Sequence, residues 1–193
     1  LVLLSLYIYG NYEINKNKKI ISKTNEKVFV KIISPNFDLK YDLSINEIEE
    51  RFKKLTRYSE PDEKQQTLFI WPEGVFSGYS YEEILSFKKI VTKNFSEKHL
   101  IVFGVNKLDA KSGNFYNSMV ITDNNFSIIQ SYNKRKLVPF GEFLPFENFL
   151  NNFGLKKITE GHGSFLKGKT NKNLSVNNIN ILPLICYEII FTE

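Results

Sequence analysis

The chain has 193 residues, of which 42% are hydrophobic, and this size and composition fit one globular domain with a substantial core. The net charge of +5 is modestly basic, and the lysines are scattered among asparagines and isoleucines rather than gathered in one block. With no zinc-finger spacing and no aromatic RNA-binding signature, the sequence argues against nucleic-acid binding. The single cysteine excludes an internal disulfide and a cysteine-based metal cluster.

The opening stretch of the chain is apolar but short. A helix needs about 20 residues to span a bilayer, so we predict that residues 1–10 are the end of a transmembrane helix, with Tyr7 and Tyr9 at the membrane interface. A signal-peptide core and the first strand of a soluble domain are the alternatives. Residues 11–27 are rich in Asn and Lys and are expected to form a linker. Because the chain lacks an initial Met and stops soon after an apolar run, we expect an internal fragment of a longer protein.

Strands and helices alternate in the first half of the chain. Short apolar runs predict strands over 28–33, 67–71 and 100–105. Apolar residues at helical spacing after Ser44 predict a helix, and Glu47 three residues after Ser44 predicts a capping box at its start. A second helix is expected over 81–94, with Ser80 as its N-cap. Helices that follow strands in this way indicate an α/β domain.

The second half of the chain is richer in strands and loops. A hairpin is expected from 115–122 and 126–132 around Asp123-Asn124-Asn125, followed by a loop over 133–146. A short helix over 146–153, a glycine-rich loop over 161–168 and one or two strands over 175–185 complete the predicted order. Hairpins after parallel-type strands favour a mixed sheet.

The last apolar run of the chain ends at its only cysteine, Cys186. A buried strand that stops at a single reactive side chain is a common way for α/β enzymes to hold a nucleophile rigidly. The alternative is that Cys186 is a small core residue, since free cysteine is among the most buried residue types.

Two other polar positions follow apolar runs. Glu73 comes directly after a predicted strand, where a carboxylate can act as a general base, although a solvated turn or a helix cap is the alternative. Lys134 leads into an apolar loop, where a lysine can stabilise an oxyanion or a thiolate, although a basic surface turn is the alternative. His99 and His162 are alternative bases; we expect His99 at the surface and His162 in a flexible glycine loop.

Three motifs carry a resemblance to a known family: Trp71-Pro72-Glu73, then Tyr132-x-Lys134-x-x-Leu137-Val138-Pro139-Phe140-Gly141-Glu142, then Cys186-Tyr187-Glu188. In this order they resemble the carbon-nitrogen hydrolase (nitrilase) superfamily, and within it the apolipoprotein N-acyltransferase family. The resemblance implies an α/β fold, a nitrilase-like αββα sandwich that is partial here, over residues 28–193 and truncated at its C-terminus. It also implies a transmembrane bundle before the domain.

The resemblance further implies a triad in which Glu73 is the general base, Lys134 holds the oxyanion and Cys186 is the nucleophile. Supporting site residues would be Glu142, Tyr187 and Glu188. The implied reaction moves a fatty acyl chain from a phospholipid, through a thioester on the cysteine, to the α-amino group of the lipid-modified N-terminal cysteine of an apolipoprotein. No metal and no cofactor are implied.

The resemblance places the enzyme in the bacterial inner membrane, with the catalytic domain facing the periplasm. Two alternatives stay open. A soluble amidase or nitrilase could use the same triad on a small substrate. A non-catalytic, membrane-attached binding module could share the fold, in which case the thiol would be unreactive.

Overall fold

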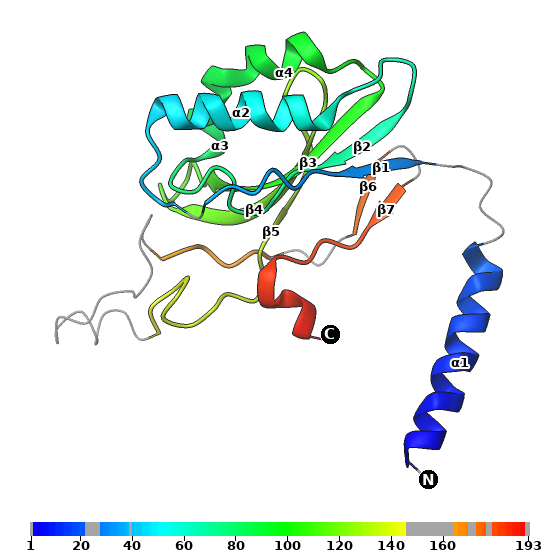
Figure 1. The fold of residues 1–193 in the computed structure, drawn as a ribbon. Coiled ribbons are helices and arrows are strands. Elements are labelled where there is room, and N and C mark those ends of the chain that lie inside the picture. The colour runs from blue at the N-terminus through cyan, green and yellow to red at the C-terminus, as the bar shows by residue number, and fades with distance from the viewer. Residues whose placement is uncertain are drawn as a thin grey trace.

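A five-stranded mixed sheet forms the centre of the computed structural model, which describes residues 2–21, 28–38, 40–145, 164–169, 173–176 and 179–191 (Figure 1). The strands are β1 (Phe29–Ile32), β2 (Thr67–Ile70), β3 (His99–Leu108), β4 (Phe115–Thr122) and β5 (Ile128–Asn133), and they lie in this order across the sheet. β1, β2 and β3 are parallel, whereas β3, β4 and β5 are antiparallel. The predicted strands, the hairpin and the mixed sheet are confirmed.

Helices cover one face of this sheet (Figure 1). They are α2 (Ile45–Ser59), α3 (Tyr81–Ile84) and α4 (Lys88–Asn94), with a 3-10 turn (Leu85–Phe87) between the last two. The single helix predicted over 81–94 is therefore interrupted. The hydroxyl of Ser86 donates to the Glu83 carbonyl, and such a side-chain bond competes with regular helix hydrogen bonding.

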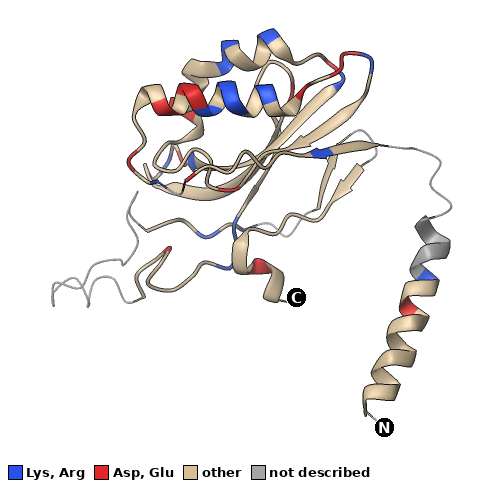
Figure 2. Ribbon diagram, in the orientation of Figure 1, with Lys and Arg blue, Asp and Glu red and all other residues tan. Residues whose placement is uncertain are grey.

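The start of α2 is fixed by the predicted capping box. Ser44 Oγ accepts from Glu47 N at 3.3 Å, and Glu47 Oε2 accepts from Ser44 N at 2.8 Å. Figure 2 shows acidic residues in the first half of α2 and basic residues in the second half. This order of charges suits the helix dipole, and it leaves the apolar side of α2 for the sheet.

An aromatic core fills the space between α2 and the sheet. Phe52 is fully buried and stacks on Phe76 with ring centroids 4.4 Å apart, while Phe103 stacks on Phe126 at 5.4 Å. The Trp71 indole N–H donates to Ser59 Oγ at 3.0 Å, so the polar atom of this buried ring has a partner.

His99 lies in this core and not at the surface, so our expectation for it is wrong. Its ring packs edge-on against Phe69 and Phe95. Nδ1 accepts from Ser96 N at 3.0 Å, and Nε2 lies 2.9 Å from the Asp62 carbonyl, to which it donates. Because both ring nitrogens have hydrogen-bond partners inside the protein, His99 can be fully buried at the start of β3.

The opposite face of the sheet carries a second, smaller layer. β6 (Leu174–Val176) and β7 (Ile179–Ile181) form a two-stranded antiparallel sheet. Gln130 of β5 and Ser175 of β6 exchange side-chain to backbone hydrogen bonds, which join the two sheets. A second apolar cluster lies at this layer; its buried members are Leu68, Leu100, Val102, Ile121, Tyr132, Leu174 and Ile185.

The N-terminal segment forms α1 (Val2–Ile21), which stands apart from the sheet in Figure 1. Residues 11–21, which we predicted as linker, are therefore helical, and 22–27 lie outside the described residues. Among the helices that the structure describes, none combines the length and the apolar character that a membrane crossing needs. The helix expected over 146–153 and His162 also lie outside the described residues.

Candidate active site

Glu73 lies in a tight turn directly after β2. Trp71 N still donates to the Val102 carbonyl at 2.9 Å, and the chain then turns through Gly74, whose φ is +67°. Glu73 packs over Gly104 of β3, where an added Cβ would lie 3.5 Å from Glu73 Cγ. This contact holds the base of the Glu73 side chain against β3, just beyond the carboxyl end of β2.

The surroundings of Glu73 favour its protonated form. Although the residue is exposed at the surface, neighbouring protein atoms shield its carboxyl group from water, and this desolvation raises its pKa. The Lys134 ammonium opposes the rise, whereas Glu142 and Glu188 add to it. A carboxyl group with a raised pKa is suited to accept and return a proton near neutral pH.

Lys134 follows β5 and is almost completely buried, with 1% of its side chain exposed. Its backbone is fixed on both sides: Lys134 N donates to the Asn117 carbonyl and Gly168 N donates to the Lys134 carbonyl, each at 2.8 Å. Gly168 has no space for a side chain, because a Cβ there would lie 2.0 Å from the Asn133 carbonyl oxygen. The position of Lys134 is thus set by backbone contacts from two separate segments.

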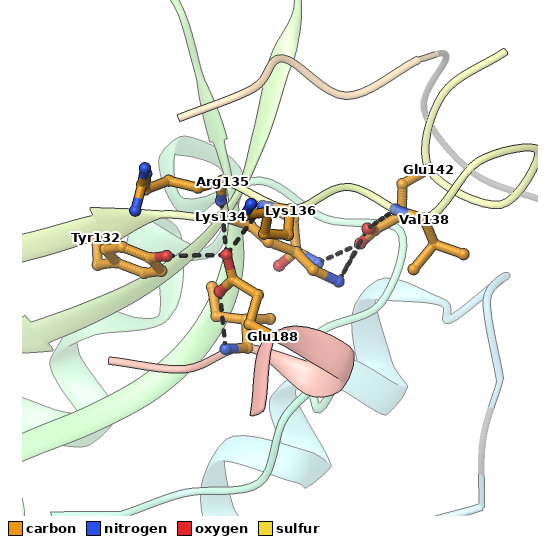
Figure 3. Close-up of polar contacts among 9 residues, drawn as sticks. Tyr132, Lys134, Arg135, Lys136, Val138, Glu142 and Glu188 are labelled. Atoms are coloured by element: carbon orange, nitrogen blue, oxygen red, sulfur yellow. Dashed lines mark hydrogen bonds and ion pairs between the residues drawn. The ribbon is translucent and has the colours of Figure 1, made fainter. Parts of the chain in front are cut away.

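Glu142 neutralises the buried lysine. Lys134 Nζ lies 2.8 Å from Glu142 Oε2 and donates to Oε1 at 2.9 Å (Figure 3). The same carboxylate accepts from Asn117 Nδ2 at 2.8 Å and from Val138 N at 3.0 Å. Glu142 therefore pairs with the lysine and also holds the backbone of the loop that follows it, through the N–H of Val138.

Glu188 forms the second carboxylate centre. It is 3% exposed and accepts four hydrogen bonds, from Tyr132 Oη at 2.9 Å, Arg135 N at 2.8 Å, Lys136 N at 3.0 Å and Ile185 N at 3.0 Å (Figure 3). Glu188 therefore ties the turn after β5 to the segment that carries Cys186.

Cys186 does not end a buried strand, so this prediction is wrong. β7 stops at Ile181, and the chain continues as an extended segment in which Leu182 and Leu184 are exposed while Pro183 and Ile185 are buried. A continuous apolar run predicts a strand that is buried on both of its faces. In this segment only one face is buried, because alternate residues face solvent.

Cys186 begins a 3-10 helix (Cys186–Ile190), with its φ at +53°. Its side chain is exposed, which contradicts the alternative reading of a core cysteine. A non-glycine residue in the left-handed region is uncommon and is often found at functional positions. The turn therefore presents the thiol outward from a well-fixed backbone.

The structure brings four of the six predicted site residues into one electrostatic group: Glu73, Lys134, Glu142 and Glu188. Cys186 is connected to this group along the chain, because the backbone N–H of the preceding residue, Ile185, donates to Glu188 Oε2 at 3.0 Å. Tyr187 is 60% exposed and is neither in the core nor among these contacts. Among the described residues, no group of His, Cys, Asp or Glu side chains could hold a metal ion.

Sequence reasoning missed Tyr132 and Asn117 as members of the site. Tyr132 precedes Lys134 by two residues, and this spacing alone would place both on one face of a strand. Ser118 pairs with Asn133 in the hairpin, so Asn117 lies opposite Lys134 one step further along. Counting pairs outward from the hairpin turn would have placed Lys134 opposite Tyr116 instead, because the ladder shifts its register by one residue between Thr122 and Ile121.

The sequence of the chain matches the profile of one protein family. That profile, described as carbon-nitrogen hydrolase, covers residues 42–193, so the chain belongs to the carbon-nitrogen hydrolase family. β1 precedes the matched region but pairs with β2, so it extends the same sheet.

Curated relatives of the chain are named apolipoprotein N-acyltransferase. The protein from Rhodopseudomonas palustris is 29% identical over 204 residues, covering 100% of this chain and 38% of the relative. The protein from Bradyrhizobium diazoefficiens is 33% identical over 133 residues, covering 66% of this chain and 25% of the relative. The chain thus spans well under half the length of these relatives.

A solved structure agrees in fold. The carbon-nitrogen hydrolase from Helicobacter pylori G27 superposes with a TM-score of 0.52 at 16% identity, covering 83% of this chain and 52% of that one. At this identity the likeness concerns the fold alone, and it confirms the nitrilase-type α/β architecture.

Proposed function

We propose that this chain carries the catalytic site of a bacterial N-acyltransferase. The enzyme moves a fatty acyl chain from a phospholipid to the α-amino group of the lipid-modified N-terminal cysteine of an apolipoprotein. The names of the relatives support this substrate class. The observation that carries the chemistry is the exposed, backbone-strained Cys186. The Glu188 carboxylate ties its segment to the turn after the buried lysine, because it accepts from Ile185 N and from Arg135 N.

In the first half-reaction, Glu73 removes the proton from the Cys186 thiol. The thiolate attacks the carbonyl carbon of the phospholipid ester, and the oxyanion is stabilised by Lys134. An ammonium group has three N–H donors, and its contacts with the two Glu142 oxygens use two of them. In this scheme the third donor serves the oxyanion. As the C–O bond breaks, the departing lysophospholipid oxygen takes the proton from Glu73, which leaves a thioester.

In the second half-reaction, the free α-amino group of the apolipoprotein attacks the thioester carbonyl. Glu73 accepts the proton that the amine loses, and the C–S bond breaks to return the cysteine thiolate, which Glu73 reprotonates. The product is an amide, which is more stable than the thioester. Every step uses groups of the chain and its two substrates. We place this chemistry at the periplasmic face of the inner membrane, where the phospholipid is part of the bilayer and the apolipoprotein is anchored by its lipid.

The test uses the full-length gene product in detergent. The protein is incubated with phospholipid and quenched with acid, and the mass of the peptide that carries Cys186 is measured. We expect a fatty-acyl adduct that hydroxylamine releases and that is absent in Glu73→Gln. Glu47→Gln, a carboxylate change on α2, is the matched control and keeps the adduct.

Other outcomes separate the alternatives. An adduct with small amides but none with phospholipid would indicate an amidase instead. No adduct with either substrate would leave a binding module that shares the fold.

A further inference from the structure

We propose that Tyr132 is a positioning residue that, through Glu188, holds the Cys186 turn in register with Lys134. The consequence for acyl transfer rests on the proposed function. The positional link itself rests only on the contacts among the described residues. Tyr132 touches neither substrate nor the reacting atoms in this scheme; it acts through the carboxylate.

Glu188 bridges two segments that are far apart in the sequence. Its Oε1 accepts from Tyr132, Arg135 and Lys136, which all belong to the β5 side. Its Oε2 accepts from Ile185 N, on the side of the nucleophile. Two of these bonds fix a residue directly next to a candidate catalytic group, because Arg135 follows Lys134 and Ile185 precedes Cys186.

Tyr132 differs from the other donors to Glu188. Three of the donors are backbone N–H groups outside the sheet, whereas the Tyr132 hydroxyl belongs to a side chain of β5 (Figure 3). Tyr132 pairs with Met119 in the β4–β5 ladder, and its ring is buried in the second apolar cluster with Leu68 and Ile185. The Tyr132 hydroxyl is thus the hydrogen bond that connects the sheet to the Glu188 carboxylate.

The protonation state of Tyr132 suits this role. Burial, together with the neighbouring Glu188 carboxylate, raises the pKa of Tyr132 to about 12. The phenol therefore stays a hydrogen-bond donor across the pH range in which a cysteine thiol ionises. The hydrogen bond from Tyr132 to Glu188 is therefore kept at every pH at which a cysteine thiol becomes a thiolate.

Tyr132→Phe is the direct test, because it removes the hydroxyl and leaves the ring in the core. Tyr81→Phe is a matched control: its hydroxyl is also buried and donates to the Phe126 carbonyl at 2.6 Å, on the helix-covered face. Each variant loses one buried hydrogen bond, so similar losses of thermal stability are expected. Only Tyr132→Phe disturbs the link between the two catalytic segments.

Alkylation of Cys186 by iodoacetamide, followed against pH in the full-length gene product, gives a readout that needs no acyl substrate. We expect Tyr132→Phe to slow alkylation about tenfold at neutral pH, because the turn that carries the thiol is no longer fixed to the sheet. For acyl transfer, we expect kcat to fall by a similar factor with the phospholipid KM within about twofold. Tyr81→Phe should stay within about twofold in both assays.

Glu188→Gln extends the test to the carboxylate. A glutamine keeps the shape but offers a single acceptor oxygen, so it cannot serve both segments. If Tyr132 acts through Glu188, the double variant Tyr132→Phe with Glu188→Gln is no slower than Glu188→Gln alone.

Two results would overturn the proposal: equal alkylation profiles for Tyr132→Phe and Tyr81→Phe, or additive effects in the double variant. A wild-type protein that shows the expected alkylation pattern but forms no thioester with phospholipid would keep the positional link and remove the acyltransferase proposal.

Discussion

The two sides of the five-stranded sheet use buried polar groups for different purposes. On the helix-covered side, the partners are neutral: Trp71 donates to a serine hydroxyl, and Arg51 donates to the carbonyls of Val75 and Asp38. On the opposite side, the Lys134 ammonium pairs with the Glu142 carboxylate, and four donors share the Glu188 carboxylate.

This difference has a practical meaning. A neutral buried bond can be lost at a cost to stability alone, whereas loss of one member of a buried ion pair leaves an uncompensated charge. Stability and activity should therefore respond separately to substitutions on the two sides. The predictions below test that separation, beginning with the largest effect.

Cys186→Ala should give the largest loss of activity with no loss of stability. The side chain is exposed, and alanine meets the same backbone strain at φ +53° that cysteine does. We expect acyl transfer to fall on the order of 10³-fold or more, with an unchanged melting temperature. Mass spectrometry of the acyl adduct and a thermal melt measure the two quantities. A variant that still forms the adduct would show that another residue is the nucleophile.

Lys134→Met should reduce both activity and stability. It leaves Glu142 partly buried without its cation, and breaking a buried pair costs about 3–5 kcal/mol. Urea denaturation measures this loss. Adding Glu142→Gln should restore part of the stability and none of the activity. Lys53→Met removes an exposed pair with Glu49 on α2 and should change neither quantity, so a large effect there would break the comparison.

Phe52→Ala should reduce stability without affecting the chemistry. This fully buried ring stacks on Phe76, and its removal should cost about 3–5 kcal/mol by transfer and cavity effects. We expect kcat per folded molecule to be retained at low temperature. Denaturation curves combined with titration of the reactive thiol separate the folded fraction from the rate. A lower kcat at full folding would mean that the aromatic core also positions the site.

The smallest effects should have opposite signs for two carboxylates. Hydrogen bonds from Lys40 and Ser44 lower the pKa of Glu47 to about 2, from an ordinary value of 4.5. Glu47 therefore stabilises the fold above pH 4.5, and this contribution disappears as the pH falls toward 2. Desolvation raises the pKa of Glu73 above 4.5, so its ionisation at higher pH costs stability.

We accordingly expect Glu47→Gln to be less stable than the wild type at pH 7. Glu73→Gln should be more stable than the wild type at pH 7 and should lose this advantage as the pH falls to 4.5. Urea midpoints measured across this pH range check both signs. Identical trends for the two variants would contradict the electrostatic difference between the two sides.

Local signals allowed a large part of the fold to be predicted from the sequence. The capping box at Ser44 and the apolar spacing after it located α2, and the polar turn at 123–125 located the hairpin, because these patterns depend on neighbouring residues. Glu73 was placed after its strand for the same reason. The interruption after Ile84 was not foreseen, since it depends on one serine hydroxyl.

The parts that were not predicted depend on distant contacts. His99 is buried because two aromatic rings and the Asp62 carbonyl surround it, and Asp62 lies 37 residues away. The segment before Cys186 is only half-buried, because alternate residues of the apolar run 182–185 face the protein and the others face solvent. Tyr132 meets Glu188 across 56 residues, and no pattern along the chain reports such a pair.

The way in which Glu188 binds the turn after β5 has a consequence for sequence variation. Arg135 enters the network through its backbone N–H, which every amino acid except proline can supply. In a saturation mutagenesis library selected for growth, position 135 should accept most side chains and reject proline, directly beside an intolerant position 134. A position that contributes only its backbone N–H can thus be required for the arrangement of the site and still accept many different side chains.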